Sequence, residues 1–171
     1  MKPENIFINN NGYLKIVDLG LSRENIKKYK DDKSFCGTPE YRAPEIIEGK
    51  GYGQAADWWS LGAIIYEMLT GIPPFYNKNR ETLFYNIKID QLKSHKYLSK
   101  EAIDLLERLF IKDPDKRLGC GPNGSQDIKS HPFFAKISWE DILDKKIMPP
   151  FMPELRRYFD PKYFDLELDF L

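Results

Sequence analysis

The feature that most constrains this chain is an apolar segment that runs from Trp58 to Leu69. Apolar residues recur along it at helical spacing and also fill many positions between, which predicts a helix that is apolar nearly all round. A helix of this kind is buried inside a fold. We expect it to begin with Asp57 as its N-cap and to end at Gly71. The segment contains Glu67 and is too short to span a bilayer, so we expect no membrane insertion.

The first twenty residues carry the pattern of a β-hairpin. Two short β-prone runs, 6–8 and 14–17, are separated by an Asn-rich segment that ends in Asn-Gly. Asn and Gly tolerate the positive φ that tight hairpin turns require. Residues 21–53 then lose all periodicity, which predicts a long loop. A loop of this length within a domain is usually functional or disordered.

The rest of the chain predicts three more helices and a tail. Helical patterns cover 80–89, a segment that starts at Ser99 as its cap, and 125–130. Residues 135–171 place four prolines between aromatic residues, which favours an extended tail over further packed helices. The predicted fold is therefore mainly α, with a small β-hairpin and an extended C-terminal tail.

Composition narrows the class of protein. The 171 residues contain 26 basic and 26 acidic side chains, so no overall field attracts nucleic acid, and we expect no nucleic-acid partner. The two cysteines, Cys36 and Cys120, are far apart, which argues against a zinc site or a disulfide scaffold. Residues 1–4 lack the apolar stretch of a signal peptide. We expect an intracellular protein, in the cytoplasm and also open to the nucleus.

The hairpin places three polar residues near one another. Asn5 precedes its first strand and Asp18 follows its second, so the fold brings an amide and a carboxylate together. One carboxylate, one amide oxygen, phosphate oxygens and water are the usual ligands of Mg²⁺ in phosphoryl transfer. Lys2 would supply a positive charge for the phosphate. The alternative is structural: Asp18 caps a turn and Asn5 satisfies backbone groups.

These residues belong to a longer series of motifs. The chain resembles the C-terminal lobe of a eukaryotic protein kinase, with seven motifs in family order. They are Lys-Pro-Glu-Asn (2–5), Asp-Leu-Gly (18–20), Ala-Pro-Glu (43–45), Asp-Trp-Trp-Ser-Leu-Gly (57–62), Gly-Ile-Pro-Pro-Phe (71–75), Asp-Pro-Asp-Lys-Arg-Leu (113–118) and His-Pro-Phe-Phe (131–134). The resemblance implies ATP and Mg²⁺ as cofactors and protein Ser or Thr as the phosphoryl acceptor.

The subgroup is also visible. The segment Phe-Cys-Gly-Thr-Pro-Glu-Tyr (35–41), the double Trp at 58–59 and the Pro-rich tail are similar to the AGC group of Ser/Thr kinases. The resemblance implies two regions, a partial kinase domain over 1–134 and an AGC C-terminal extension over 135–171. The alternative for the tail aromatics is simple packing.

The resemblance assigns roles around the phosphates. Asn5 and Asp18 would hold Mg²⁺ and so help to bind the nucleotide, and Lys2 would neutralise charge on the transferred phosphoryl group. Thr38 would bridge Lys2 and the catalytic Asp. Ser34 occupies the position of the phosphosite used by an upstream activating kinase, and Arg23 that of a basic partner for its phosphate. The alternative is that Ser34 is an ordinary loop residue.

The resemblance also assigns substrate-binding and structural roles. Glu4 and Glu67 would hold basic substrate residues upstream of the target Ser or Thr. Glu45 and Arg117 would form the structural ion pair beneath the activation segment. Asp57 would anchor the backbone near the catalytic loop. Arg42 replaces an apolar residue of the family near the pocket for the substrate residue after the target Ser or Thr, so the sequence does not predict which residue is preferred there.

The largest departure from the pattern is that the chain carries neither the His-Arg-Asp motif with its catalytic Asp nor the N-terminal lobe. Three interpretations follow. The chain is a fragment of an active kinase, a lone lobe that binds substrates or kinases without catalysis, or an inactive remnant with an exposed apolar face. We expect the 171 residues by themselves to be inactive.

Overall fold

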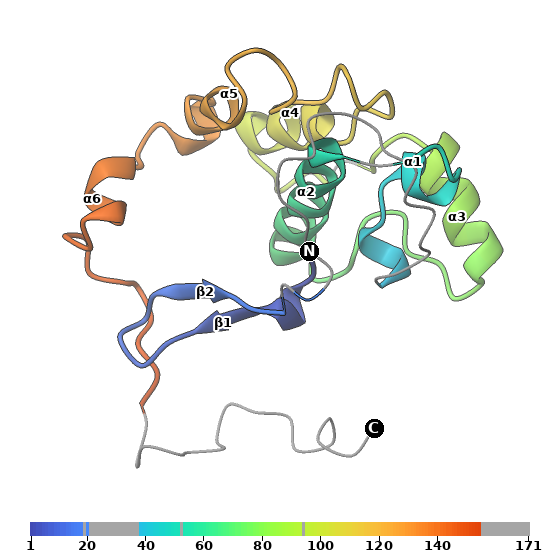
Figure 1. Ribbon diagram of the computed structural model, residues 1–171. Coiled ribbons are helices and arrows are strands. Elements are labelled where there is room, and N and C mark those ends of the chain that lie inside the picture. The colour runs from blue at the N-terminus through green and yellow to red at the C-terminus, as the bar shows by residue number, and fades with distance from the viewer. Residues whose placement is uncertain (19, 21–37, 52, 94, 155–171) are drawn as a thin grey trace.

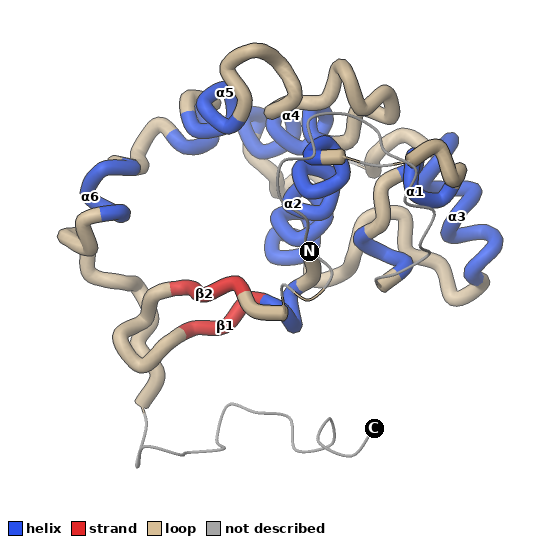
Figure 2. The backbone as a smooth tube through the Cα atoms, in the orientation of Figure 1, coloured by secondary structure: helices blue, strands red, loops and turns tan. Residues whose placement is uncertain are grey.

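The computed structural model describes residues 1–18, 20, 38–51, 53–93 and 95–154. Most of the regular structure is helical and one two-stranded sheet lies beside the helices (Figures 1 and 2), which confirms the predicted fold class. The strands are β1 (Ile6–Ile8) and β2 (Leu14–Ile16). The helices are α1 (Pro44–Ile47), α2 (Gln54–Thr70), α3 (Arg80–Ile89), α4 (Lys100–Leu109), α5 (Ser125–Lys129) and α6 (Trp139–Leu143), with short 3-10 turns at Pro3–Asn5, Pro39–Tyr41 and Pro132–Phe134.

Helix α2 is the predicted central helix, but it begins earlier than the sequence suggested. Its N-cap is Gly53 and its first residue is Gln54, so the prediction that Asp57 caps it was wrong. Gln54 and the two alanines after it are good helix formers, and the earlier start lengthens the helix by about one turn. The helix ends at Gly71, whose φ of 83° is the left-handed conformation that glycine adopts readily.

The core lies where α2 crosses α4. Leu105, Leu106 and Leu109 of α4 are fully buried and pack against α2. Gly62 allows the close approach, because a Cβ there would lie 3.0 Å from Cβ of Leu109. Trp59 is also fully buried in this core. Burial of such side chains stabilises the fold by roughly 1.5 to 3 kcal/mol each.

Two further helices were predicted well. Helix α3 spans Arg80–Ile89, and the side chain of Asn79 caps it by accepting a hydrogen bond from the amide of Thr82. The Ser99 hydroxyl caps α4 by accepting one from the amide of Ala102. These caps satisfy amides that the first helical turn leaves without partners.

Two short helices were not predicted. Helix α1 lies within the segment expected to be a loop, where Pro44 at its first turn has a backbone already suited to a helix. Helix α6 lies within the tail that we expected to be extended. Ser138 caps it by accepting from the amide of Asp141, a signal present in the sequence but masked by the many prolines that follow. None of the helices that the structure describes is long and apolar enough to cross a membrane.

The hairpin forms as predicted. Strands β1 and β2 are antiparallel, with Ile6 opposite Ile16 and Ile8 opposite Leu14. The side chain of Asn9 organises the turn by accepting hydrogen bonds from the amides of Asn11, at 3.0 Å, and Tyr13, at 2.9 Å. The hairpin therefore carries the segments before β1 and after β2 to the same end.

Candidate active site

The residues proposed to bind Mg²⁺ meet at the base of the hairpin. Asn5 ends the 3-10 turn that leads into β1, and its carbonyl accepts from the amide of Val17 at 2.9 Å. This pairing places Asp18 beside Asn5, and the Asn5 Nδ2 donates to Asp18 Oδ2 at 3.5 Å. The backbone amide of Asn5 also donates to the carbonyl of Lys2 at 3.1 Å. Lys2, Asn5 and Asp18 therefore share one small region.

This set of donors suits Mg²⁺ bound together with a nucleotide. Mg²⁺ usually takes one or two protein oxygens and fills its remaining positions with phosphate oxygens and water. Asn5 and Asp18 supply an amide and a carboxylate of this kind. Within the described ranges there is no cluster of three or more His, Cys, Asp or Glu that would enclose a metal ion by itself. The pair thus fits a metal that arrives with phosphate.

The phenol of Tyr41 is bonded to one carboxylate and is affected by the charges of two more. Its hydroxyl donates to Glu67 Oε2 at 2.5 Å, so the turn after Thr38 is joined to α2. Burial, the bond to Glu67 and the negative charges of Glu67, Glu4 and Glu40 all raise the pKa of Tyr41 above its ordinary value. Glu67 is thus bonded to Tyr41 and the charge of Glu4 also acts on it, while their role in holding basic substrate residues stays a prediction. Glu40, which we did not single out from the sequence, adds a third charge.

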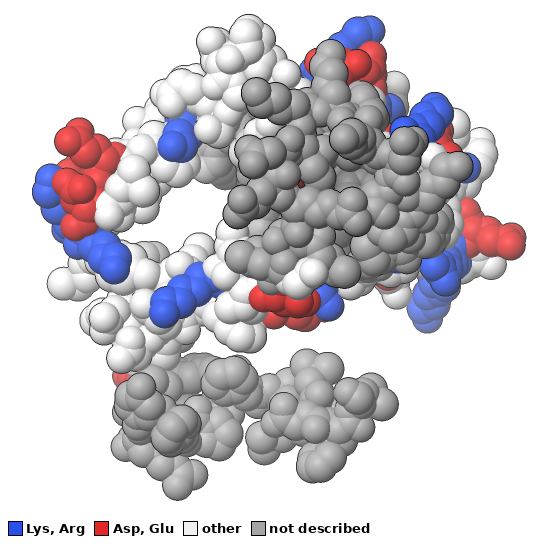
Figure 3. All heavy atoms as spheres, viewed as in Figure 1, with Lys and Arg blue, Asp and Glu red and all other residues white. Residues whose placement is uncertain are grey.

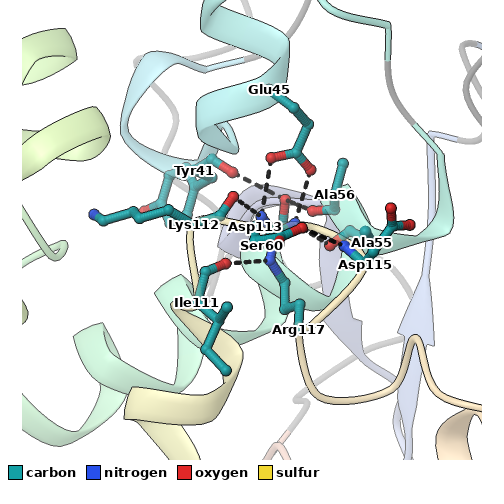
Figure 4. A network of polar contacts seen from close by, with 10 residues as sticks. All are labelled: Tyr41, Glu45, Ala55, Ala56, Ser60, Ile111, Lys112, Asp113, Asp115 and Arg117. Atoms are coloured by element: carbon teal, nitrogen blue, oxygen red, sulfur yellow. Dashed lines mark hydrogen bonds and ion pairs between the residues drawn. The ribbon is translucent and has the colours of Figure 1, made fainter.

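A buried ion pair lies beneath this region (Figure 4). The Nη1 of Arg117 lies 2.7 Å from Glu45 Oε1 and its Nη2 lies 2.9 Å from Oε2, which is the two-pronged geometry of a strong pair. Arg117 is 1% exposed and Glu45 is 3% exposed. The guanidinium also donates to three carbonyls, those of Ala55, Ile111 and Lys112. The pair therefore joins α1, the start of α2 and the segment after α4.

A second contact in Figure 4 fixes the turn that carries Tyr41. The buried hydroxyl of Ser60 lies 2.9 Å from the carbonyl of Tyr41 and 3.0 Å from that of Ala56, within hydrogen-bonding distance of both. Since Ser60 and Glu67 both belong to α2, the central helix holds Tyr41 at its backbone and at its hydroxyl. The sequence did not reveal this double attachment, because no local pattern links residues so far apart in the chain.

Asp57 lies in α2, close to the start of the chain. It remains exposed to solvent, yet nearby protein atoms displace enough water to raise the pKa of its carboxyl. The amino group of Met1 has the opposite, smaller effect. The role of Asp57 as an anchor for the backbone near the catalytic loop stays a prediction.

The structure gives less support to the roles of the other predicted residues. Between Thr38 and Lys2, both of which the structure describes, there is no hydrogen bond, so the bridging role stays a prediction. Ser34 and Arg23 lie outside the described residues, as does Leu19 of the Asp-Leu-Gly motif. The predictions for Ser34 and Arg23 therefore rest on sequence position alone.

One lysine that the sequence did not reveal lies close to the ion pair. The Nζ of Lys112 donates to the carbonyl of Ile87 at 2.6 Å and lies 4.2 Å from the centre of the Phe75 ring. Burial lowers the pKa of Lys112 to about 8, although the charge of Asp90 opposes the change. This lysine connects the end of α3 to the aromatic residues beside α2.

The helices, the hairpin that brings Asn5 and Asp18 together and the buried ion pair of Glu45 with Arg117 are the features that the resemblance to a protein kinase C-terminal lobe implied. Residues 1–134 match the protein kinase domain, and the chain belongs to that family. The relatives that it matches include RAC serine/threonine-protein kinases, which belong to the AGC group, as the resemblance implied.

The similarity extends over nearly the whole chain. It is 46% identical to RAC-beta serine/threonine-protein kinase A of Xenopus laevis over 167 residues, which cover 98% of this chain and 34% of that protein. It is 45% identical to the RAC-beta kinase of Homo sapiens, over 98% of this chain and 35% of that protein. For the RAC kinase of Drosophila melanogaster the identity is 45%, and the shares are 98% and 27%. The chain thus spans about a third of the length of these relatives, or less.

Proposed function

We propose that this chain is part of a serine/threonine protein kinase that transfers the γ-phosphoryl group of ATP to protein substrates inside the cell. The observation that carries the proposal is the base of the hairpin, where Asn5 and Asp18 lie within hydrogen-bonding distance in a chain of the protein kinase family. The 171 residues carry no candidate for the catalytic Asp that precedes Lys2 in the family pattern. We therefore infer that they do not catalyse the reaction by themselves.

The residues at the base of the hairpin would have different roles in phosphoryl transfer. Asn5 and Asp18 would hold Mg²⁺, which neutralises charge on the phosphates when it is bound. Because only a short turn separates Lys2 from Asn5, the ammonium of Lys2 would reach the same phosphates. Charge stabilisation by a fixed side chain is effective because it needs no reorganisation during the reaction.

The acidic side chains that act on Tyr41 suit a substrate with basic residues upstream of its Ser or Thr. Glu67 accepts a hydrogen bond from the Tyr41 hydroxyl, and the charges of Glu4 and Glu40 also act on that hydroxyl, which supports a role for these carboxylates in receiving arginine side chains. Carboxylates bind guanidinium groups through two parallel, charge-assisted hydrogen bonds. We propose that phosphorylation of Ser34 by an upstream kinase activates the protein and that Arg23 binds the phosphate.

A peptide assay tests this specificity. The natural protein, purified from its own cells, is assayed on one peptide with upstream arginines and on one with alanines there. Glu67→Gln should lower kcat/KM for the arginine peptide by about 10- to 100-fold, since a hydrogen bond to a charged group contributes roughly 1.5 to 3 kcal/mol. The alanine peptide should be unaffected.

Glu81→Gln is the matched control, because Glu81 is an exposed acid in the first turn of α3. It should leave both peptides unchanged. Equal rates on the two peptides in the unmodified protein would remove the basic preference from the proposal while leaving the kinase assignment intact.

A second candidate function is partner binding without catalysis. Four apolar side chains of the hairpin are between 46% and 67% exposed, which is a large apolar surface for so small an element. They are Phe7, Ile8, Leu14 and Ile16. Phosphoryl transfer that is lost on Asp18→Asn would select the kinase. Tight binding to a substrate or kinase, without transfer and without sensitivity to Asp18→Asn, would select the binding module.

A further inference from the structure

The hairpin that carries the metal-type residues has little support from the helices. Its strands are three residues each, and an isolated two-stranded hairpin is at best marginally stable in water. Among the strand residues, Ile6 packs against the hydrophobic core. Ile6 is at the base, so the far end of the hairpin depends on other contacts.

Those contacts come from residues 145–154, which we call the strap. The hydroxyl of Tyr13, directly after the turn, donates to the carbonyl of Lys145 at 3.0 Å and lies 3.5 Å from that of Ile147. The Nζ of Lys145 lies 5.4 Å from the centre of the Tyr13 ring, in range of a cation–π interaction. One side chain thus makes three contacts with residues that are more than 130 positions away.

The turn and the strap also touch at Gly12. A Cβ on Gly12 would lie 2.5 Å from the carbonyl oxygen of Phe151 and 2.6 Å from Cβ of Pro149. Real Cβ atoms do not approach this closely, so the strap packs directly on the glycine backbone. The turn therefore fits the strap without room for another side chain.

The strap reaches the hairpin from a fixed starting point. The amide of Lys146 donates to the carbonyl of Asp141 at 2.8 Å, which ties the strap to α6. The Trp139 indole in turn donates to the carbonyl of Lys129 at 2.9 Å, which ties α6 to α5. Figure 1 shows the chain leave the helices at α5, pass through α6 and return to the hairpin turn. Figure 3 shows open space between this arc and the helices.

From these contacts we propose that the strap is a brace for the hairpin, and that Tyr13 is a positioning residue which helps to keep Asn5 and Asp18 together. The metal-binding consequence rests on the proposed function. The brace itself does not, because it concerns only how this chain orders its own hairpin.

The first test breaks the brace from the strap side. Lys146→Pro removes the amide that donates to Asp141 and forces Lys145, whose φ is 57°, toward an extended conformation. Lys146→Ala is the matched control, because it loses the same side-chain charge but keeps the amide. Amide hydrogen exchange is followed by NMR on the full chain without nucleotide. The amide of Val17 is the reporter, since it pairs with Asn5 at the base of the hairpin.

We expect Val17 to exchange at least about tenfold faster in Lys146→Pro and to stay within about twofold of the unmodified chain in Lys146→Ala. Loss of the nuclear Overhauser contact between Gly12 and Pro149 reports that the strap has left the turn. If that contact is lost and Val17 exchange is unchanged, the proposal is overturned.

The second test breaks the same contact from the hairpin side. Gly12→Ala adds the clash with the strap, and it also places alanine at a φ of 79°. Gly71→Ala is the control for the backbone strain, because Gly71 has a φ of 83° but nothing within 4 Å of a new Cβ. In Gly12→Ala the strap should leave the turn, which changes the NMR resonances of residues 145–154. In Gly71→Ala these resonances should stay the same. A strap that stays in place in both Lys146→Pro and Gly12→Ala also overturns the proposal.

Mn²⁺ as a paramagnetic probe separates the brace from the metal role. In the unmodified chain Mn²⁺ should broaden the side-chain amide resonances of Asn5, and about tenfold more Mn²⁺ should be needed in Lys146→Pro. If Mn²⁺ never broadens Asn5 while Val17 still responds to Lys146→Pro, the metal role fails and the brace stands. If Mn²⁺ broadens Asn5 equally in both proteins, the positioning role of the strap is refuted.

Discussion

Loss of Arg117 should remove most of the stability of the helical lobe. Arg117→Ala deletes a side chain that is 1% exposed and leaves Glu45, 3% exposed, as a buried charge without its partner. The carbonyls of Ala55, Ile111 and Lys112 lose their donors as well. The substitution therefore removes the ion pair and also every other hydrogen bond that the Arg117 guanidinium donates in this network.

The size of the effect follows from these groups. Breaking a buried ion pair by removing one partner costs about 3 to 5 kcal/mol. The three carbonyls add to this, although each contributes only about 0.5 to 1.5 kcal/mol net. A domain of this size is stable by about 5 to 15 kcal/mol in total. We therefore expect Arg117→Ala to lack a cooperative unfolding transition at 25 °C.

Urea unfolding followed by tryptophan fluorescence, to which the fully buried Trp59 contributes, measures this loss. Arg117→Lys is the graded comparison, because an ammonium keeps the charge but not the planar, two-pronged geometry, and it should cost about 2 to 3 kcal/mol. Arg108→Ala is the control, since Arg108 forms an exposed pair within α4 that contributes little. An Arg117→Ala protein that unfolds cooperatively with a loss below about 1 kcal/mol would refute the reasoning.

Three further predictions concern caps and titration. Ser99→Ala should destabilise the protein by about 1 kcal/mol in urea, because the amide of Ala102 loses its acceptor; a loss near zero would contradict the cap. The raised pKa of Tyr41 contributes stability that is complete below about pH 10 and declines above it, since the unfolded chain ionises there first. Tyr41→Phe should therefore show a shallower fall in Tm between pH 10 and 11.5, and an unchanged slope would count against it. The lowered pKa of Lys112 has the opposite effect on stability, because above about pH 8 the folded chain releases this proton before the unfolded chain does. In urea titrations the unmodified protein should therefore gain stability relative to Lys112→Met between pH 7 and pH 10. A constant difference in stability would exclude the shift.

Local signals in the sequence predicted much of the fold. Ser99 has a short-range cap that can be read from neighbouring residues, and the hairpin has both its β-prone runs and its Asn-Gly turn. The start of α2 was placed too late because Asp57 is a good cap by type, whereas Gly53 takes that position in the fold. Helix α6 was missed because its cap at Ser138 stands before a proline-rich stretch that suggests an extended chain.

The site was predictable where the chain itself brings residues together. Asn5 and Asp18 meet because a hairpin joins its own two ends. The contact of Tyr41 with Glu67 and the contact of Tyr13 with Lys145 depend on packing between distant segments, so periodicity and composition carry no information on either. The family resemblance suggested the role of Glu67, but the partner that holds it became visible only in three dimensions.

The measurement that tests the central claim most directly is phosphoryl transfer by the natural protein with and without Asp18→Asn. The protein is purified from its own cells and assayed with labelled ATP, Mg²⁺ and a Ser peptide with upstream arginines. We predict transfer by the unmodified protein and a loss of at least about 100-fold on Asp18→Asn, since this carboxylate would hold the metal that neutralises the phosphates. Transfer that persists unchanged in Asp18→Asn would contradict the account.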